Sequence, residues 1–303
     1  MTHFLLDSGD PKEYREIATL TKQDGDELWG STTNPTLIEE TEEQLIHHKE
    51  TPQEAFRLQK ELVTEILAIV PGAVSAEVYA DNHTSAEQMA EQGREIASWH
   101  ERIVVKLPTT LEGLKARTLL RKDGITINNT LVFSQEQVFA ITLHEQLMKK
   151  IYGETNNHVP CFISPFVGRL DDTGINGMSL VSNALSITHQ WFEKDLVWIL
   201  EASVRNVSHL KAGIDMGCEL ITAPAKIYRE WFRLSEKEKL TIYVEAPAIL
   251  QTISLWVPSD TLRNIATPEE LIGAIESGKL NINHQLTDTG IEKFAADWKK
   301  LFT

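Results

Sequence analysis

The sequence predicts an α/β fold, a closed (β/α)8 TIM barrel with extra C-terminal helices. Three observations favour this fold: eight short apolar runs of strand length, amphipathic stretches of helical period between them, and a length of 303 residues, which fits one such barrel. An open doubly wound sheet is the second choice. We expect residues 1–303 to form a single barrel domain, with a C-terminal helical extension over roughly 230–303.

The expected strands are the apolar runs at residues 4–6, 28–32, 74–79, 103–107, 125–127, 161–163, 196–200 and 220–222. Helix starts between them are marked by capping-box patterns, in which a Ser or Thr is followed three residues later by Glu or Gln. These patterns begin at Thr51, Thr84, Ser134 and Thr267. Strands and helices therefore alternate along the chain, as a parallel barrel requires.

Two polar stretches, 39–50 and 153–158, are interpreted as solvated insertions between barrel elements. After the eighth strand, apolar residues recur at helical spacing from Leu271 to Trp298. We expect these late helices to pack against the barrel and to form a lid over its mouth.

The formal net charge of -15 argues against nucleic acid or an anionic membrane surface as a partner, because both select clustered Lys and Arg. The two cysteines, Cys161 and Cys218, lack metal-type spacing and predict reduced thiols in a cytoplasmic protein. No segment approaches the roughly 20 apolar residues of a membrane span. Assembly as a homo-oligomer is compatible with the sequence.

Polar residues close the predicted strands, at the end where barrels of this class carry their active sites. In chain order they are Asp7, Thr32, Thr33, Asn34, Glu77, Lys106, Asn128, Thr130, Ser164, Arg169, Ser203, Arg205 and Thr222. Taken singly, each has a structural explanation as a turn or cap residue. Because every strand contributes one, the sequence predicts that they meet in one site.

Lys106 is the residue that points to a particular chemistry. It closes an apolar strand, so its ammonium group must reach the barrel mouth or be paired inside. We expect burial and cationic neighbours to lower its pKa from about 10.4, which would yield a neutral, nucleophilic amine. Dinucleotide, Walker and zinc-protease motifs are absent from the sequence, so no cofactor and no metal are expected.

Five segments resemble motifs of the transaldolase family, in the family's order, and together they span nearly the whole chain. They are 31–37 (STTNPTL), 105–114 (VKLPTTLEGL), 128–134 (NNTLVFS), 163–172 (ISPFVGRLDD) and 202–206 (ASVRN), and the tail 286–291 (LTDTGI) is also similar. Two features depart from the family: Val204 replaces the usual Phe, and the polar stretch before Cys161 lengthens a short connection.

The resemblance implies that Lys106 forms a Schiff base with a ketose carbonyl and that Asp7 removes the proton of the C4 hydroxyl. It implies that Glu77 acts as acid and base through a water held near Thr130. The expected substrate-binding residues are Thr32, Asn34, Asn128, Ser164 and Phe166 for the sugar, and Arg169, Ser203 and Arg205 for the phosphate.

By the same resemblance the substrates are sugar phosphates of the pentose phosphate pathway. A dihydroxyacetone unit would pass from fructose 6-phosphate or sedoheptulose 7-phosphate to erythrose 4-phosphate or glyceraldehyde 3-phosphate. The first alternative is an aldolase that releases free dihydroxyacetone, although such enzymes typically carry Gln and Tyr where this chain has Glu77 and Phe166. The second is a barrel that binds sugar phosphates without turnover.

Overall fold

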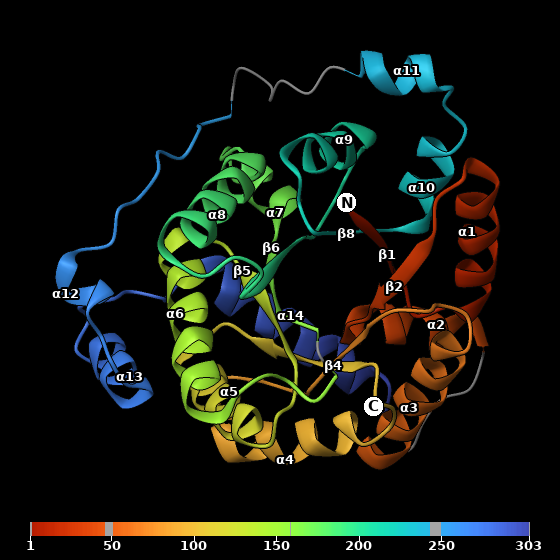
Figure 1. The fold of residues 1–303 in the computed structure, drawn as a ribbon. Coiled ribbons are helices and arrows are strands. Elements are labelled where there is room, and N and C mark those ends of the chain that lie inside the picture. Colours follow the sequence, from red (N-terminus) through yellow and green to blue (C-terminus); the bar gives the residue numbers. More distant parts are fainter. Residues whose placement is uncertain (1, 46–50, 158, 243–249, 303) are drawn as a thin grey trace.

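Eight parallel strands form a closed barrel in which each strand pairs with the next and β8 pairs with β1, which confirms the predicted fold class (Figure 1). The computed structural model describes residues 2–45, 51–157, 159–242 and 250–302. The strands are β1 His3–Asp7, β2 Leu28–Thr32, β3 Val74–Glu77, β4 Ile103–Pro108, β5 Ile127–Val132, β6 Cys161–Pro165, β7 Val197–Glu201 and β8 Leu220–Ala223.

Helices surround the barrel between successive strands. They are α1 Pro11–Asp24, α2 Pro35–Leu45, α3 Pro52–Leu67, α4 Ala86–Ala97, α5 Leu111–Lys122, α6 Gln135–Tyr152, α7 Val167–Asp171, α8 Gly177–Trp191, α9 Val207–Met216 and α10 Ala225–Trp231. The C-terminal part adds α11 Glu236–Thr241, α12 Asp260–Arg263, α13 Pro268–Glu276 and α14 Gln285–Lys300. Among the described residues, no helix has the length and apolar character needed to cross a bilayer.

The predicted helix starts hold at three places and shift by one residue at the fourth. The hydroxyls of Thr51, Ser134 and Thr267 each accept a hydrogen bond from the backbone three residues on. At α4 the cap is Ser85, in a reciprocal capping box with Gln88. Thr84 is unavailable because its hydroxyl donates to Asp81 Oδ1 at 2.9 Å in the preceding turn.

The fifth strand lies further along the chain than predicted, at Ile127–Val132 instead of 125–127. The polar residues that suggested its end are inside it, and Asn128 and Asn129 form side-chain hydrogen bonds with neighbouring elements. Asn129, for example, accepts a 2.9 Å hydrogen bond from Arg117 Nε of α5, and Arg117 is itself paired with the buried Glu145 of α6. A strand can carry such residues in its interior when neighbouring elements supply their partners.

The two predicted insertions have different outcomes. Residues 39–45 belong to helix α2, so the prediction of an insertion between elements was wrong there; Glu39 is buried and Glu40 is exposed. Residues 46–50 lie outside the described part of the chain. In the second stretch Gly153, Glu154 and Asn156 are exposed as predicted, but Thr155 is buried and donates to Val159 O at 2.8 Å; His158 is not described.

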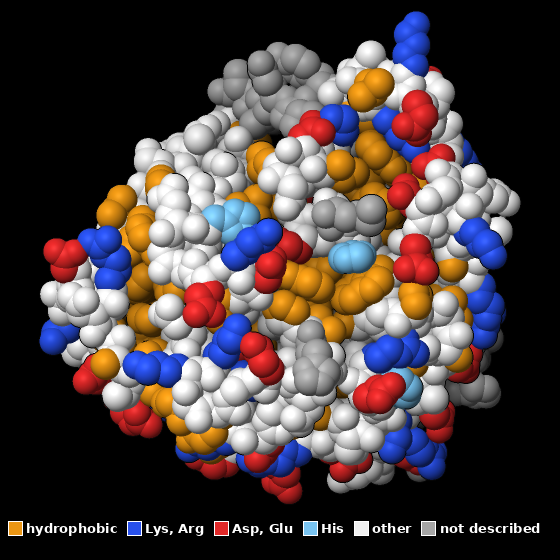
Figure 2. All heavy atoms as spheres, in the orientation of Figure 1, with side chains coloured by type: hydrophobic (Ala, Val, Ile, Leu, Met, Phe, Trp, Pro, Cys, Tyr) orange, Lys and Arg blue, Asp and Glu red, His pale blue; other side chains and the backbone are white. Residues whose placement is uncertain are grey.

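The C-terminal helices α13 and α14 pack against different parts of the barrel. Helix α13 packs on the outside of the barrel against α5 and α6. Helix α14 packs along α2 and against β5, and Figure 1 shows it crossing behind the strands in that view. The predicted lid therefore corresponds to α14, not to α13. On the face shown in Figure 2, acidic and basic side chains are interspersed around a central apolar area.

Glu201, the last residue of β7, is fully buried beside α9. Neither carboxylate oxygen has a hydrogen-bond partner among the described residues. Gly213 of α9 leaves room for it, since a Cβ there would lie 1.8 Å from Glu201 Oε2. Because burial penalises the charged form, the pKa of Glu201 is raised well above its ordinary value.

We expect Glu201→Gln to remove a pH-dependent loss of stability. A raised pKa means that the folded protein binds the proton more tightly than the unfolded chain does. The stabilisation is therefore complete below the unfolded pKa of about 4.3 and is lost as the pH rises through the folded pKa. In urea unfolding from about pH 5 to about pH 8, the variant should gain stability relative to the parent as the pH rises. A pH-independent difference would contradict this account.

Candidate active site at the mouth of the barrel

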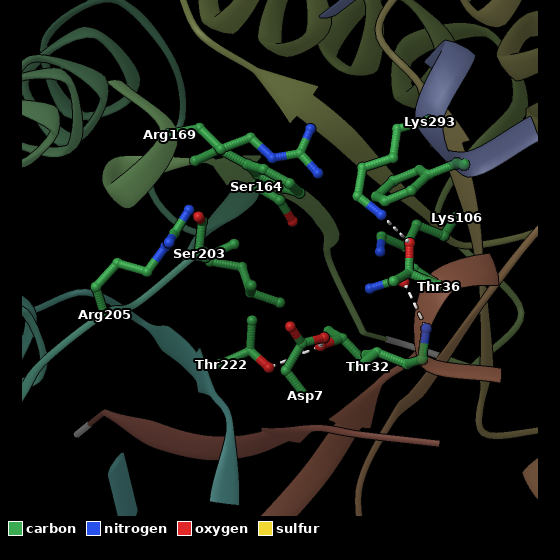
Figure 3. Close-up of a pocket in the computed structure, with 16 residues that line it drawn as sticks. Asp7, Thr32, Thr36, Lys106, Ser164, Arg169, Ser203, Arg205, Thr222 and Lys293 are labelled. Atoms are coloured by element: carbon green, nitrogen blue, oxygen red, sulfur yellow. Dashed lines mark hydrogen bonds between the residues drawn. The ribbon is translucent and has the colours of Figure 1, made fainter. Parts of the chain in front are cut away.

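A cavity of about 170 Å³ opens among residues at the carboxyl ends of the strands (Figure 3). Nine of the predicted site residues line it: Asp7, Thr32, Asn34, Lys106, Ser164, Phe166, Arg169, Ser203 and Arg205. Thr222, another of the strand-closing residues, also lines it, together with Thr36, Leu37, Leu200, Ala202, Lys293 and Phe294. Glu77, Asn128 and Thr130 lie next to this set without lining the cavity.

Lys106 projects from β4 into the barrel and is only 3% exposed. Its Nζ donates to the carbonyl oxygen of Thr33 at 3.0 Å and lies 3.0 Å from Glu77 Oε2. The strand register places the two charged residues side by side, since Glu77 of β3 is the direct partner of Lys106. The lysine is thus a buried amine, held by a carboxylate and a carbonyl at the edge of a cavity.

Glu77 is buried, and burial raises its pKa even though the charge and hydrogen bond of Lys106 act in the opposite direction. Glu77 also borders a second cavity of about 10 Å³, whose walls include Pro108, Ile291 and Phe294. A space of that size holds about one water molecule. Glu77 therefore contacts Lys106 and also borders a cavity with space for about one water molecule.

Asp7 ends β1 and lines the cavity, where its carboxylate accepts the last hydrogen bond of a chain that runs from Thr222 through Thr32 (Figure 3). Thr32 Oγ1 donates to Asp7 Oδ1 at 2.7 Å, so Thr222, which lies 2.7 Å from the same Thr32 oxygen, is the donor in that second bond. Burial raises the pKa of Asp7, and Lys106 and the Thr32 hydrogen bond partly oppose the rise. This carboxylate is better suited to accept a proton than an exposed one.

Asn128 lies below the cavity in a hydrogen-bonded chain across the barrel. Its Oδ1 accepts from Ser164 of β6 at 2.6 Å, and its Nδ2 donates to Ser75 of β3 at 3.1 Å. Further along β5, Thr130 Oγ1 is buried and has no hydrogen-bond partner among the described residues.

Asn34 has a structural task besides its place on the cavity wall. Its Oδ1 accepts a 3.1 Å hydrogen bond from the backbone of Leu37 in the first turn of α2. The same residue therefore fixes where α2 begins and borders the cavity. Its predicted contact with substrate would use the amide group that does not cap the helix.

Two arginines face the other end of the cavity and differ in their surroundings (Figure 3). Arg169 Cζ lies between the rings of Phe166 at 5.3 Å and Phe294 at 5.4 Å, and it has no acidic partner among the described side chains. Burial and the nearby Arg205 lower its pKa. Arg205 is about half exposed and pairs with Asp172 at 3.1 Å.

The backbone around these arginines is closely packed. Ser203 has a φ of 59°, in the left-handed region, and its carbonyl oxygen accepts from Gly168 N at 3.0 Å. A Cβ at Gly168 would lie 2.4 Å from that oxygen and from Arg205 Cγ. A glycine at position 168 is therefore needed for the β6 and β7 ends to approach this closely.

Sequence reasoning missed the contribution of α2 and α14 to the site. Asp297 Oδ2 is bonded to Thr36 Oγ1 and to Lys293 Nζ, both at 2.5 Å, and Thr36, Lys293 and Phe294 all line the cavity. The helical pattern predicted that this region packs against the barrel and covers its mouth, but it did not identify Phe294 as a residue that lines the cavity. The spacing of Lys293 and Asp297, an i,i+4 ion pair, was the available signal, but such pairs are common on exposed helices.

Residues 4–303 match the family described as Transaldolase/Fructose-6-phosphate aldolase. The chain belongs to this family. It is 34% identical to a probable transaldolase of Brucella anthropi over 98% of this chain and 96% of the relative, and 31% identical to one of Methanococcus maripaludis over 98% and 97%. A probable transaldolase 2 of Listeria monocytogenes is 35% identical over 74% of this chain and 86% of the relative.

Membership of the transaldolase/fructose-6-phosphate aldolase family confirms the resemblance inferred from the sequence motifs and makes the chain an enzyme of the transferase class. The residue assignments within the site stay predictions.

Thr32→Val is expected to raise the pKa of Asp7 further, because it removes a hydrogen bond that lowers that pKa. If ionised Asp7 is the base, the acidic limb of the kcat/KM profile should move to higher pH. Thr33→Val is the matched control, since the Thr33 hydroxyl donates to Ser75 O and not to Asp7. An acidic limb at the same pH in both variants would rule out Asp7 as the group that controls it.

Proposed function

We propose that this protein is a transaldolase that forms a Schiff base at Lys106. It would transfer a dihydroxyacetone unit from fructose 6-phosphate or sedoheptulose 7-phosphate to erythrose 4-phosphate or glyceraldehyde 3-phosphate, in the pentose phosphate pathway. The observation that carries this proposal is the buried Lys106 amine, which lines the cavity and lies 3.0 Å from a carboxylate. Family membership supports the same reaction.

In the first step the neutral Lys106 amine attacks the ketose carbonyl at C2. Glu77 is placed to accept the proton that the ammonium must lose, because it is adjacent and burial raises its pKa. The carbinolamine then loses one water, and Glu77 supplies the proton that this step needs. The small cavity beside Glu77 has space for about one water molecule, the number that Schiff-base formation releases.

In the second step the C3–C4 bond breaks while Asp7 takes the proton of the C4 hydroxyl. The electron pair of the broken bond moves into the iminium group on Lys106 and leaves an enamine, and the aldose product departs. Asp7 lines the cavity, whereas Glu77 contacts Lys106 from outside it, so the two carboxylates can act at different carbons of one substrate. The acceptor aldehyde then reacts at C3, and the steps run in reverse.

The phosphate is assigned to Arg169, Ser203 and Arg205. Arg169 is the main element of this assignment, because its guanidinium group lies against two aromatic rings and has no acidic partner in the described structure. A cation in that setting favours an anion that forms charge-assisted hydrogen bonds. The negative net charge of the chain makes such a local cationic site necessary for an anionic substrate.

Trapping with borohydride tests the proposal. After incubation with fructose 6-phosphate and borohydride, mass spectrometry should find a reduced adduct on Lys106, and Lys106→Ala should give none. Comparing turnover with and without erythrose 4-phosphate distinguishes transfer from release of free dihydroxyacetone. An adduct elsewhere, or none, would defeat the proposal and its aldolase alternative and leave a barrel that only binds sugar phosphates.

We predict that Arg205→Ala raises KM for phosphorylated donors far more than for free dihydroxyacetone. Loss of one charge-assisted hydrogen bond costs about 1.5–3 kcal/mol, which corresponds to a rise in KM of roughly tenfold to a hundredfold. Steady-state kinetics with both donors measures the difference. Equal effects on the two donors would count against a phosphate-binding role.

Four further expectations stay predictions: a single domain, a cytoplasmic location, independence from cofactors and assembly as a homo-oligomer.

A further inference from the structure

Phe294 of α14 lies on the boundary between the two cavities. The residue lines the substrate cavity of about 170 Å³ and also the cavity of about 10 Å³ beside Glu77. It is only 5% exposed. Phe294 therefore belongs both to the wall of the proposed sugar site and to the wall of the space next to Glu77.

The ring of Phe294 also faces both cations of the proposed mechanism. Lys106 Nζ lies 5.9 Å from its centroid and Arg169 Cζ lies 5.4 Å from it. At these distances the electron-rich face attracts both cations, and the apolar ring occupies space that water would otherwise fill. The amine is thus covered on this side by a hydrocarbon surface.

Several contacts fix α14, and with it the ring. At its C-terminal half, Asp297 is bonded to Thr36 at the start of α2. At its N-terminal end, Thr287 Oγ1 donates to Leu131 O of β5 at 2.9 Å. Between them the helix approaches so closely that a Cβ at Gly290 would lie 2.6 Å from a methyl group of Leu131. The ring position is therefore set by bonds on both sides of it.

We propose that Phe294 is a specificity-determining residue, which keeps water from the enamine so that the fragment is transferred and not released. This inference rests on the proposed function. Release requires a proton to add at C3 of the enamine; water then adds to C2 of the iminium, the C–N bond breaks, and free dihydroxyacetone leaves the restored amine. In transfer, C3 instead forms a bond to the aldehyde carbon of the acceptor. Both routes end when water hydrolyses an iminium at C2, so they differ in the proton that release must add at C3. Excluding water from the enamine carbon disfavours that proton transfer.

Phe294→Ala should open the wall between the two cavities. At saturating fructose 6-phosphate, the rate of dihydroxyacetone release without acceptor, divided by the transfer rate with saturating erythrose 4-phosphate, should rise roughly tenfold or more. Phe294→Leu keeps much of the apolar volume and should give a smaller rise in this ratio. If the alanine variant does not fold, the leucine variant is used for the test instead. Because the substrates are saturating, changes in their KM values do not affect the ratio of the two rates.

Trp298→Leu is the matched control. Trp298 also belongs to α14, but it packs with Ile38 and Leu58 of α2 and α3 and lines neither cavity. This variant loosens the helix and leaves the ring in place, so its ratio should stay near that of the parent.

An unchanged ratio in Phe294→Ala or Phe294→Leu, or an equal rise in Trp298→Leu, would overturn the inference. Borohydride trapping on the parent protein distinguishes failure of the proposed function from failure of this inference alone. If no Lys106 adduct forms, the proposed function fails and this inference fails with it; if the adduct forms and the ratio does not respond, only the inference fails.

Discussion

The buried pair of Lys106 and Glu77 is the interaction on which the rest of the site depends. Both side chains are about 4% exposed and their charged atoms are 3.0 Å apart. Removing one partner would leave a charge without compensation inside the barrel, at a cost of about 3–5 kcal/mol. The pair lies where two adjacent strands meet, and in the proposed reaction this short contact passes a proton between the carboxylate and the amine.

Closure of the barrel places the other residues of the candidate site around this pair. Asp7 comes from the first strand, Lys106 from the fourth, and the two arginines follow the sixth and seventh strands. The same closure brings Thr222 of the last strand against Thr32 of the second, across β1, and so supports Asp7. Helix α14, in the C-terminal extension, forms a further part of the cavity wall. The extension therefore belongs to the site.

Much of this arrangement can be predicted from the sequence, because a charged side chain at the end of an apolar strand must either reach the barrel mouth or be paired inside. That reasoning finds Asp7 and Lys106 directly. It fails at β5, where Asn128 and Asn129 bond to Ser75 and Arg117 on other elements, because the local sequence pattern does not show these partners. It also fails at Phe294, since an apolar residue at helical spacing looks the same whether it packs in a core or lines a cavity.

A crystal structure of the protein after borohydride reduction with fructose 6-phosphate tests the central claim most directly. The account predicts continuous electron density from Lys106 Nζ to C2 of the sugar, with Asp7 near the C4 oxygen and the phosphate against Arg169 and Arg205. A sugar phosphate that lies in the cavity without a bond to Lys106, or with its phosphate away from both arginines, would contradict it.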